Sequence, residues 1–307
     1  MKNPLFYRFS QFIAFIMGAR VFVTLLLTFA LYVSTFFLFN QEESLRNFVF
    51  DFRVHGIIFC TILSVLAGGI INQFYDLEKD QVTKPFRTRV QYFLKQKYFL
   101  YAYIALNVFS LGIAGMISIR VFFFFLIYQF LMWFYSHKLS KLLIINNLTF
   151  VSLSLYPFFG MLFYYKTFSL LIFFMSIFIF LMLLIIDVLK DTLTKNADKV
   201  FGYFTIPNYF SSTTSSAIIV FLLVGAQISS GLIIWKMGLH SIMSYYFAAS
   251  IIIQIISVFL VLNKAKYLDK DLPVFEVFLN NKPQLKKHFD VFFTDLLAHA
   301  KKINAGF

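Results

Sequence analysis

The segment "VFFFFLIYQFLMWFY", residues 121–135, contains no charged side chain and has no polar face to turn toward water. Burial in lipid is the simplest explanation for such a run. The whole chain agrees, because 60% of its 307 residues are hydrophobic and 13% are charged, whereas an average soluble domain has about 25% charged residues. With a mean hydropathy of +0.79, the sequence predicts an integral membrane protein.

Further apolar segments on both sides of this run predict an all-α, polytopic bundle of about eight transmembrane helices. The expected spans are residues 21–40, 55–73, 98–118, 121–136, 143–165, 168–187, 216–236 and 242–262. Residues 21–262 therefore form the expected transmembrane domain.

The two ends of the chain differ from this domain. Residues 1–20 lack a small-residue cleavage site, so we interpret them as a retained interfacial segment rather than a signal peptide. Residues 263–307 turn polar abruptly, and apolar residues recur there at helical spacing between lysines. This pattern predicts a cytoplasmic, amphipathic tail that lies on the membrane surface.

The basic residues are distributed unequally between the two sides of the membrane. If both termini share one side, that side carries 22 Lys and Arg residues and the other side carries 5. Because positive charge is enriched in cytoplasmic loops, the termini and the loops after the second, fourth and sixth spans are expected in the cytoplasm, as in a bacterial-type inner membrane. Topology thus accounts for the net charge of +13, and no nucleic-acid partner is expected.

The second expected span, which ends at residue 73, runs into the polar segment "NQFYDLEKD", residues 72–80. Asn72, Asp76 and Asp80 are four residues apart, so they form one stripe on a helix. Like charges at this spacing repel one another, more strongly where they are desolvated, which favours a bound cation. The alternative, solvation of a helix end, explains a single Asp more easily than this evenly spaced set.

A second acidic stripe ends the sixth expected span. Asp187, Asp191 and Asp198 are separated by four and seven residues and share one helix face if the helix continues past the membrane. Both stripes are expected at the same membrane surface, where ionisable groups are functional candidates. Carboxylate oxygens on two facing helices suit Mg²⁺, which commonly shares its coordination with phosphate oxygens.

Basic residues lie beside both stripes, and Arg in particular can hold a phosphate through a bidentate pair of hydrogen bonds. The candidates are Lys84, Arg87, Arg89 and Lys190. Membrane topology alone would also place positive charge at these positions, so both interpretations stay open. A metal together with basic residues points to a diphosphate or a similar anion as ligand.

The segments "NQFYDLEKDQVTKPFR" (72–87) and "LKDTLTKNADKVFGYFTIP" (189–207), with "FYSHKLSKLLIINNLTF" (134–150) between them, resemble the motifs of the UbiA superfamily of intramembrane prenyltransferases. The similarity covers roughly residues 15–262. It implies a helical bundle around a central cavity that opens laterally to lipid. It also implies Mg²⁺-assisted transfer of an isoprenyl group from an isoprenyl diphosphate to an aromatic or other lipophilic acceptor, as in the synthesis of a quinone precursor.

The resemblance also assigns roles by position. The metal ligands it implies are Asn72, Asp76, Asp80, Asp187, Asp191 and Asp198. The implied diphosphate ligands are Asn72, Lys84, Arg87 and Lys190, and the implied catalytic residues are Asp76, Asp80 and Asp191.

Two positions of the second motif depart from the family pattern, since Thr194 stands where an Asp is usual and Phe204 where a Lys is usual. A catalytically degenerate member that binds or carries an isoprenoid lipid is therefore an alternative. A transporter that uses the same carboxylates is a third hypothesis, opposed by the placement of both clusters at one surface. The single Cys60 excludes a disulfide framework, and the pair Gly68 and Gly69 predicts close helix packing.

Overall fold

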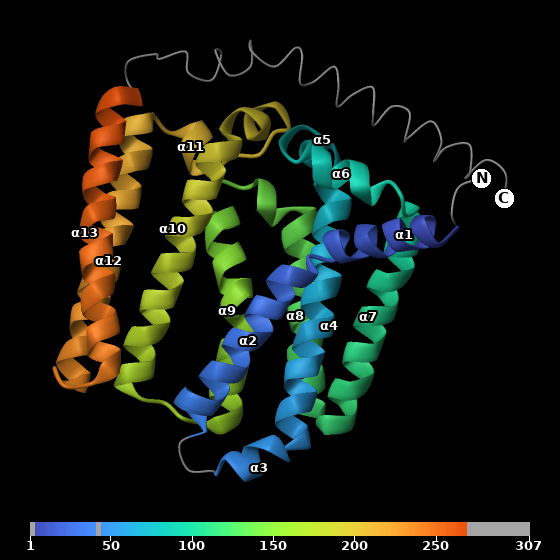
Figure 1. Ribbon diagram of the computed structural model, residues 1–307, viewed down its shortest axis with the longest axis horizontal. Helices are drawn as coiled ribbons and strands as arrows, with labels where there is room; N and C mark the ends of the chain where they lie inside the picture. The colour runs from blue at the N-terminus through green and yellow to red at the C-terminus, as the bar shows by residue number, and fades with distance from the viewer. Residues whose placement is uncertain (1–3, 41–43, 269–307) are drawn as a thin grey trace. The chain divides into compact units, whose positions relative to one another are not determined.

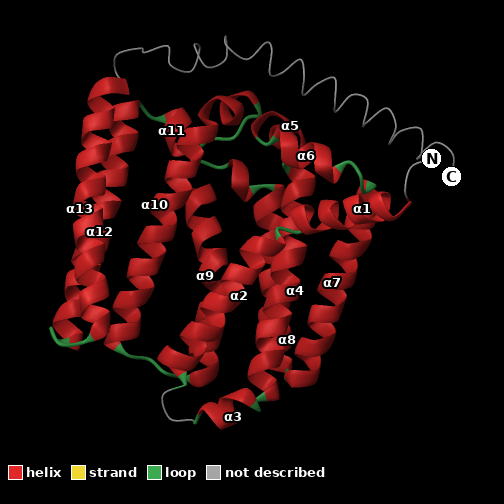
Figure 2. Ribbon diagram, viewed as in Figure 1, coloured by secondary structure: helices red, strands yellow, loops and turns green. Residues whose placement is uncertain are grey.

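The computed structural model describes residues 4–40 and 44–268, and all regular structure in these ranges is helical (Figures 1 and 2). Eight segments are long and apolar enough to cross a membrane. They are α2 with the following π-helical turn (Val21–Phe39), α4 (Phe52–Tyr75), α7 (Gln96–Ile117), α8 (Ile119–His137), α9 (Ile145–Tyr165), α10 (Leu170–Val200), α12 (Ser212–Met237) and α13 (Ile242–Leu268). In α13 the apolar span is Ile242–Asn263. The predicted all-α bundle of eight spans is confirmed.

Shorter helices connect or precede the spans. They are α1 (Pro4–Gly18), α3 (Leu45–Val49), α5 (Leu77–Thr83), α6 (Pro85–Gln91), the 3₁₀ turn Leu139–Lys141 and α11 (Ile206–Tyr209). In Figure 1, α1 runs across the direction of the spans, at the end of the bundle that also carries α5 and α6. This helix occupies most of the segment 1–20 that is expected at the interface.

The chain divides into two compact units, Met1–Val261 and Leu262–Phe307. The fold and the site described below belong to the first unit. Residues 269–307, which include most of the predicted amphipathic tail, lie outside the described residues.

Polar caps fix where several spans begin. The Asp51 carboxylate accepts hydrogen bonds from the backbone N–H groups of Arg53 and Val54 at the start of α4. Ser118 and Ser169 cap α8 and α10 in the same way. Such side chains satisfy backbone donors that have no partner within the helix.

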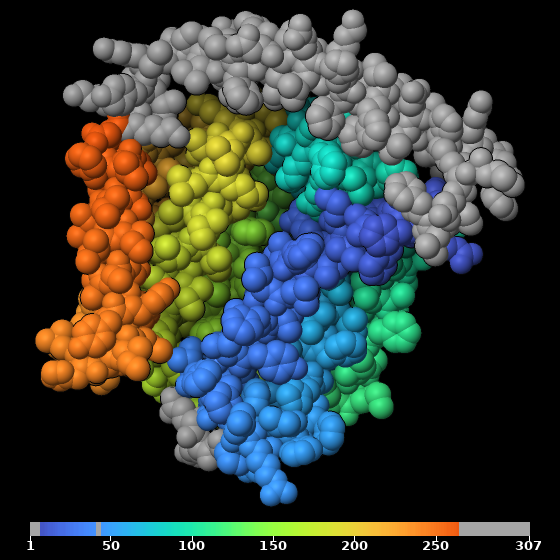
Figure 3. Space-filling model, viewed as in Figure 1, coloured from blue at the N-terminus to red at the C-terminus, as the bar shows by residue number. Residues whose placement is uncertain are grey.

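The first four spans and the last three pack around two hydrophobic cores that share α9. Val54, Phe125 and Met161 lie in the core formed mainly by α2, α4, α7, α8 and α9, whereas Val188 and Ala226 lie in the core formed mainly by α9, α10, α12 and α13. On the face shown in Figure 3, the surface of α10 is exposed between α2 and α13. The two halves of the bundle therefore meet at α9.

Gly69 allows the turn between α1 and α2 to approach α4 closely. A Cβ atom at this position would lie 2.9 Å from the backbone oxygen of Ala19, and one at Gly68 would lie 2.6 Å from the Met132 sulfur. The close packing predicted for this glycine pair is confirmed. As a consequence, Arg20, which follows Ala19, is held against the end of α4 that leads into the first acidic stripe.

A largely apolar cavity of about 710 Å³ opens between the ends of α9 and α10 that are remote from α5. Phe159, Leu162, Phe173 and Phe180 are among its lining residues. Its two serine hydroxyls are engaged by the backbone of α10, since Ser169 accepts from the Ile172 N–H and Ser176 donates to the Ile172 carbonyl. The lining therefore suits a hydrocarbon ligand rather than a charged one.

Candidate active site

The first acidic stripe lies where α4 passes into α5. Asp76 joins the two helices with φ −91° and ψ 7°, yet helical backbone bonds continue through it, because Asp76 N–H donates to the Asn72 carbonyl and Asp80 N–H to the Asp76 carbonyl. The three side chains thus keep the predicted common face. Asn72 Nδ2 donates to Asp76 Oδ2 at 2.8 Å, and Lys84 Nζ donates to Asp80 Oδ1 at 2.7 Å.

The second stripe lies on α10, which continues to Val200, beyond the predicted end of the span at residue 187. Asp187, Asp191 and Asp198 are all buried. Asn147 on α9 holds the first two together, because its Nδ2 donates to Asp187 Oδ2 and to Asp191 Oδ2 at 2.8 Å each. The continued helix satisfies the condition under which these three residues share a face.

Each end of the second stripe has a further partner. Lys190 Nζ lies 3.0 Å from Asp187 Oδ1, and the lysine side chain is 56% exposed. Thr194, at the position where the family motif has Asp, donates its hydroxyl to Asp198 Oδ2 at 2.7 Å. Thr194 therefore contributes a neutral donor to the cluster where a second carboxylate would add negative charge.

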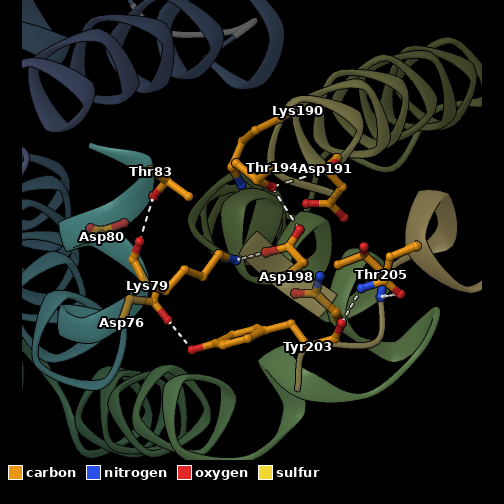
Figure 4. Close-up of polar contacts among 12 residues, drawn as sticks. Asp76, Lys79, Asp80, Thr83, Lys190, Asp191, Thr194, Asp198, Tyr203 and Thr205 are labelled. Atoms are coloured by element: carbon orange, nitrogen blue, oxygen red, sulfur yellow. Dashed lines mark hydrogen bonds and ion pairs between the residues drawn. The ribbon is translucent and has the colours of Figure 1, made fainter. Parts of the chain in front are cut away.

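Tyr203 and Lys79, neither of which belongs to a stripe, connect the two stripes (Figure 4). The Tyr203 hydroxyl donates to Asp76 Oδ1 at 2.7 Å. Lys79 Nζ forms an ion pair with Asp198 Oδ1 at 2.5 Å. The tertiary structure thus brings the two predicted acidic stripes to one site, and the residues that join them, Lys79 and Tyr203, were not identified from the sequence.

Three basic side chains lie beside the first stripe. Burial lowers the pKa of Lys84 and of Arg87, and the nearby charge of Arg20 lowers both further, while Asp80 opposes the shift. Among the described residues, Arg87 Nε and Nη2 and Arg20 Nε are buried without a hydrogen-bond partner. Guanidinium donors that are buried and unsatisfied beside a lysine form a place for an anion.

Arg20 also lies at this site, although its sequence position indicates only a positive charge that contributes to membrane topology. It precedes α2 in the left-handed conformation, with φ 54° and ψ 41°. No spacing links it to the motif at residues 72–87, so the sequence contains no signal that places it there. Arg20 is placed at the site by the packing of the α1–α2 turn against Gly69.

The oxygen donors of the site are of the kind that Mg²⁺ prefers. Asp80 Oδ2 is buried without a hydrogen-bond partner, and Asp76 and Asp191 receive hydrogen bonds from neutral donors, so negative charge is left for a cation. In residues 4–40 and 44–268, no three acidic, His or Cys side chains converge on one metal position. Mg²⁺ usually has few protein ligands and completes its shell with water and phosphate oxygens, so the donor set fits such an ion.

The site is flanked by aromatic side chains from α4 and α8. The Tyr135 hydroxyl donates to Asn146 Oδ1 at 2.9 Å. His137 stacks on Trp133 with a centroid distance of 5.4 Å and meets the Tyr75 ring edge-on at 5.4 Å. Phe204, at the position where the family motif has Lys, is 54% exposed.

Comparison with known proteins gives one family and several similar folds. The UbiA prenyltransferase family model matches residues 45–281. No curated protein matches the chain. A structure of digeranylgeranylglyceryl phosphate synthase is 19% identical, with a TM-score of 0.59 over 95% of this chain and 99% of the other.

Two further solved structures are similar in fold. A UbiA homologue from Archaeoglobus fulgidus bound to GPP and Mg²⁺ is 14% identical, with a TM-score of 0.63 over 80% of this chain and 86% of the other. An apo UbiA homologue from Aeropyrum pernix K1 is 14% identical, with a TM-score of 0.57 over 88% and 99% of the two chains.

Proposed function

Because this chain belongs to the UbiA prenyltransferase family, we propose that it is a Mg²⁺-dependent prenyltransferase of the membrane. It transfers an isoprenyl group from an isoprenyl diphosphate to an aromatic or other lipophilic acceptor. The observation that carries the proposal is the meeting of two acidic clusters, from α4–α5 and α10, with Lys84, Arg87 and Arg20 at one end of the bundle. The GPP and Mg²⁺ bound by the A. fulgidus homologue support the same ligand class.

In this proposal the basic cluster binds the diphosphate. Lys84, Arg87 and Arg20 surround one region, and the two guanidinium groups have donors with no partner among the described residues. Charge-assisted hydrogen bonds of this kind are stronger than neutral ones, and burial strengthens them further. Lys190, which is largely exposed and paired with Asp187, is proposed as a more peripheral diphosphate contact.

The carboxylates Asp76, Asp80 and Asp191 are proposed to hold the metal, with Asn72 and Asp187 beside them. A bound Mg²⁺ would neutralise charge that develops on the departing diphosphate. Asn147 orients Asp187 and Asp191 through its two hydrogen bonds, and Tyr203 orients Asp76. These neutral donors fix the carboxylate oxygens before any ligand arrives, which is the preorganisation that electrostatic catalysis needs.

The proposed reaction breaks the bond between the allylic carbon and the diphosphate oxygen, and the bonding electrons leave with the diphosphate. The allylic carbon then bonds to an acceptor atom, which releases a proton. Aromatic faces stabilise a developing allylic cation, and the Tyr135 hydroxyl donates to Asn146, whose neighbour Asn147 donates to Asp187 and Asp191. Tyr135 is therefore the aromatic side chain we propose nearest to the reacting carbon.

The apolar cavity between α9 and α10 is proposed to receive part of the isoprenyl chain. Phe173 and Phe180 line it, and they precede Asp187 on α10 by fourteen and seven residues. Steps of seven residues return to nearly the same helix face, so this face runs from the acidic cluster toward the cavity. The loops that carry the site are those predicted to be cytoplasmic, so we propose a cytoplasmic active site in a bacterial-type inner membrane.

The test is isoprenyl transfer by the purified protein in lipid, with Mg²⁺, labelled isoprenyl diphosphates and a panel of aromatic acceptors. Asp76→Asn should abolish transfer, whereas Glu78→Gln should not, because Glu78 is exposed and lies off the acidic stripe. Full turnover by Asp76→Asn would contradict the proposal. Binding of the diphosphate with no product for any acceptor would instead support the degenerate carrier.

A further inference from the structure

Lys79 extends from α5 into the space between the two acidic clusters (Figure 4). Its Nζ lies 2.5 Å from Asp198 Oδ1 and 4.1 Å from the centroid of the Tyr203 ring. The Asp198 side chain has no exposed surface, and that of Lys79 is 16% exposed. A buried carboxylate is strongly unfavourable unless a cation accompanies it. In this chain the accompanying cation is the Lys79 ammonium.

The surroundings of Asp198 leave it little capacity for a second cation. Its Oδ2 accepts the hydrogen bond from Thr194 at 2.7 Å. The Tyr203 ring covers the Lys79 ammonium in a cation–π contact, and the Tyr203 hydroxyl is fixed by Asp76. The ion pair is therefore an internal part of the connection between the clusters and not a contact at the solvent-exposed surface.

The charge balance of the clusters points the same way. Their carboxylates are Asp76, Asp80, Asp187, Asp191 and Asp198, of which three pair with Lys84, Lys190 and Lys79. The remaining two, Asp76 and Asp191, receive hydrogen bonds from Asn72, Tyr203 and Asn147, which are neutral. Among the residues that the structure describes, these two carboxylates have no ion-pair partner, and their two negative charges equal the charge of a single divalent cation.

We propose that the Lys79 ammonium is the permanent cation of the second acidic cluster and fills, at Asp198, the place of a divalent ion. Asp198 then anchors Lys79 and does not bind metal, unlike the role that the resemblance implies for it. Asp76, Asp80, Asp187 and Asp191 remain to hold metal. This inference rests on the proposed Mg²⁺-dependent function and makes Lys79 a positioning residue.

The test counts metal ions instead of turnover. The purified full-length protein is titrated with Mn²⁺ alone, and free Mn²⁺ is followed by electron paramagnetic resonance. Lys79→Met should bind about one more Mn²⁺ per chain than the unaltered protein, because the buried Asp198 charge then attracts the metal. Lys79→Arg keeps the positive charge and should match the unaltered protein.

Asp198 provides an independent variant that does not depend on the folding of Lys79→Met. Asp198→Asn should leave the number of bound Mn²⁺ ions unchanged, whereas Asp76→Asn should lower it. Folding of each variant is checked by protection of the buried Cys60 from thiol reagents.

Two results would overturn the inference: equal Mn²⁺ numbers for folded Lys79→Met and the unaltered protein, or a loss of bound Mn²⁺ in Asp198→Asn. If either occurs while the unaltered protein still transfers isoprenyl groups with Mg²⁺, the inference fails and the proposed function stands. If the unaltered protein neither binds Mn²⁺ nor transfers isoprenyl groups, both fail.

Discussion

Replacing Gly69 with Ala should move the turn that carries Arg20 and so weaken diphosphate binding. The added Cβ would lie 2.9 Å from the Ala19 oxygen, 3.2 Å from its carbonyl carbon and 3.5 Å from Arg20 Cβ. The nearest two atoms belong to the backbone, which cannot rotate away as a side chain can. Relief of the contact therefore requires the α1–α2 turn to shift away from α4.

The expected effect on stability has two parts. Exchanging Gly for Ala inside a helix is favourable by about 0.8–1 kcal/mol, whereas inserting a methyl group into a closely packed contact costs about 1–3 kcal/mol. Gly112→Ala on α7 is the matched control, because a Cβ there meets no atom within 4 Å. This variant should therefore gain the favourable helix propensity of Ala without the cost of a steric contact. The difference in unfolding free energy between the two variants should therefore be about 1–3 kcal/mol.

The assay uses Cys60 as a built-in reporter. It is the only cysteine of the chain and has no exposed surface, so a thiol-reactive fluorophore labels it as the protein unfolds. Denaturant titrations of both variants give the difference in stability. The stabilisation that inorganic diphosphate with Mg²⁺ gives to each variant, measured by the same titration, yields the affinity for diphosphate. We expect this affinity to be about three- to tenfold lower in Gly69→Ala, equivalent to roughly 0.7–1.4 kcal/mol.

The reasoning is wrong if Gly69→Ala and Gly112→Ala unfold at the same denaturant concentration. If Gly69→Ala is destabilised as expected but binds diphosphate as tightly as the control, then Gly69 does not position Arg20 for diphosphate binding.

Three further changes test other parts of the site. Arg20→Met should weaken diphosphate binding at least about tenfold, since a hydrogen bond to a charged group contributes about 1.5–3 kcal/mol; Arg120→Met, at an exposed position on α8, is the control and should have no effect on affinity. Asn147→Leu removes a donor shared by two buried carboxylates and should lower Mn²⁺ affinity measured by paramagnetic resonance, whereas unchanged affinity would exclude an orienting role. Tyr203→Phe keeps the ring over Lys79 but removes the bond to Asp76, so it should destabilise the fold by about 1.5–3 kcal/mol in Cys60 labelling, and Tyr203→Leu, which also loses the ring, should destabilise it more.

The spans and the two acidic stripes were predictable because both depend on local chemistry. An apolar run of sufficient length is enough to indicate a membrane helix, and the helical period alone places Asn72, Asp76 and Asp80, or Asp187 and Asp191, on one face. The backbone bonds through Asp76 and the continuation of α10 to Val200 agree with that local pattern.

The connections between the stripes could not be predicted in this way. Tyr203 and Asp76 are 127 positions apart in the chain, and Asn147 lies 40 and 44 positions from the carboxylates it joins. Their contacts depend on how α4, α9 and α10 pack, which no local pattern specifies.

The sequence by itself determined that this chain crosses the membrane about eight times and carries two acidic faces near one surface, because hydropathy and helical periodicity are properties of neighbouring residues. Only the tertiary structure decided which cations meet those faces. Arg20 reaches the site because Gly69 has no side chain, and Lys79 reaches Asp198 because α5 packs against α10. Both outcomes follow from packing between segments that are distant in the sequence.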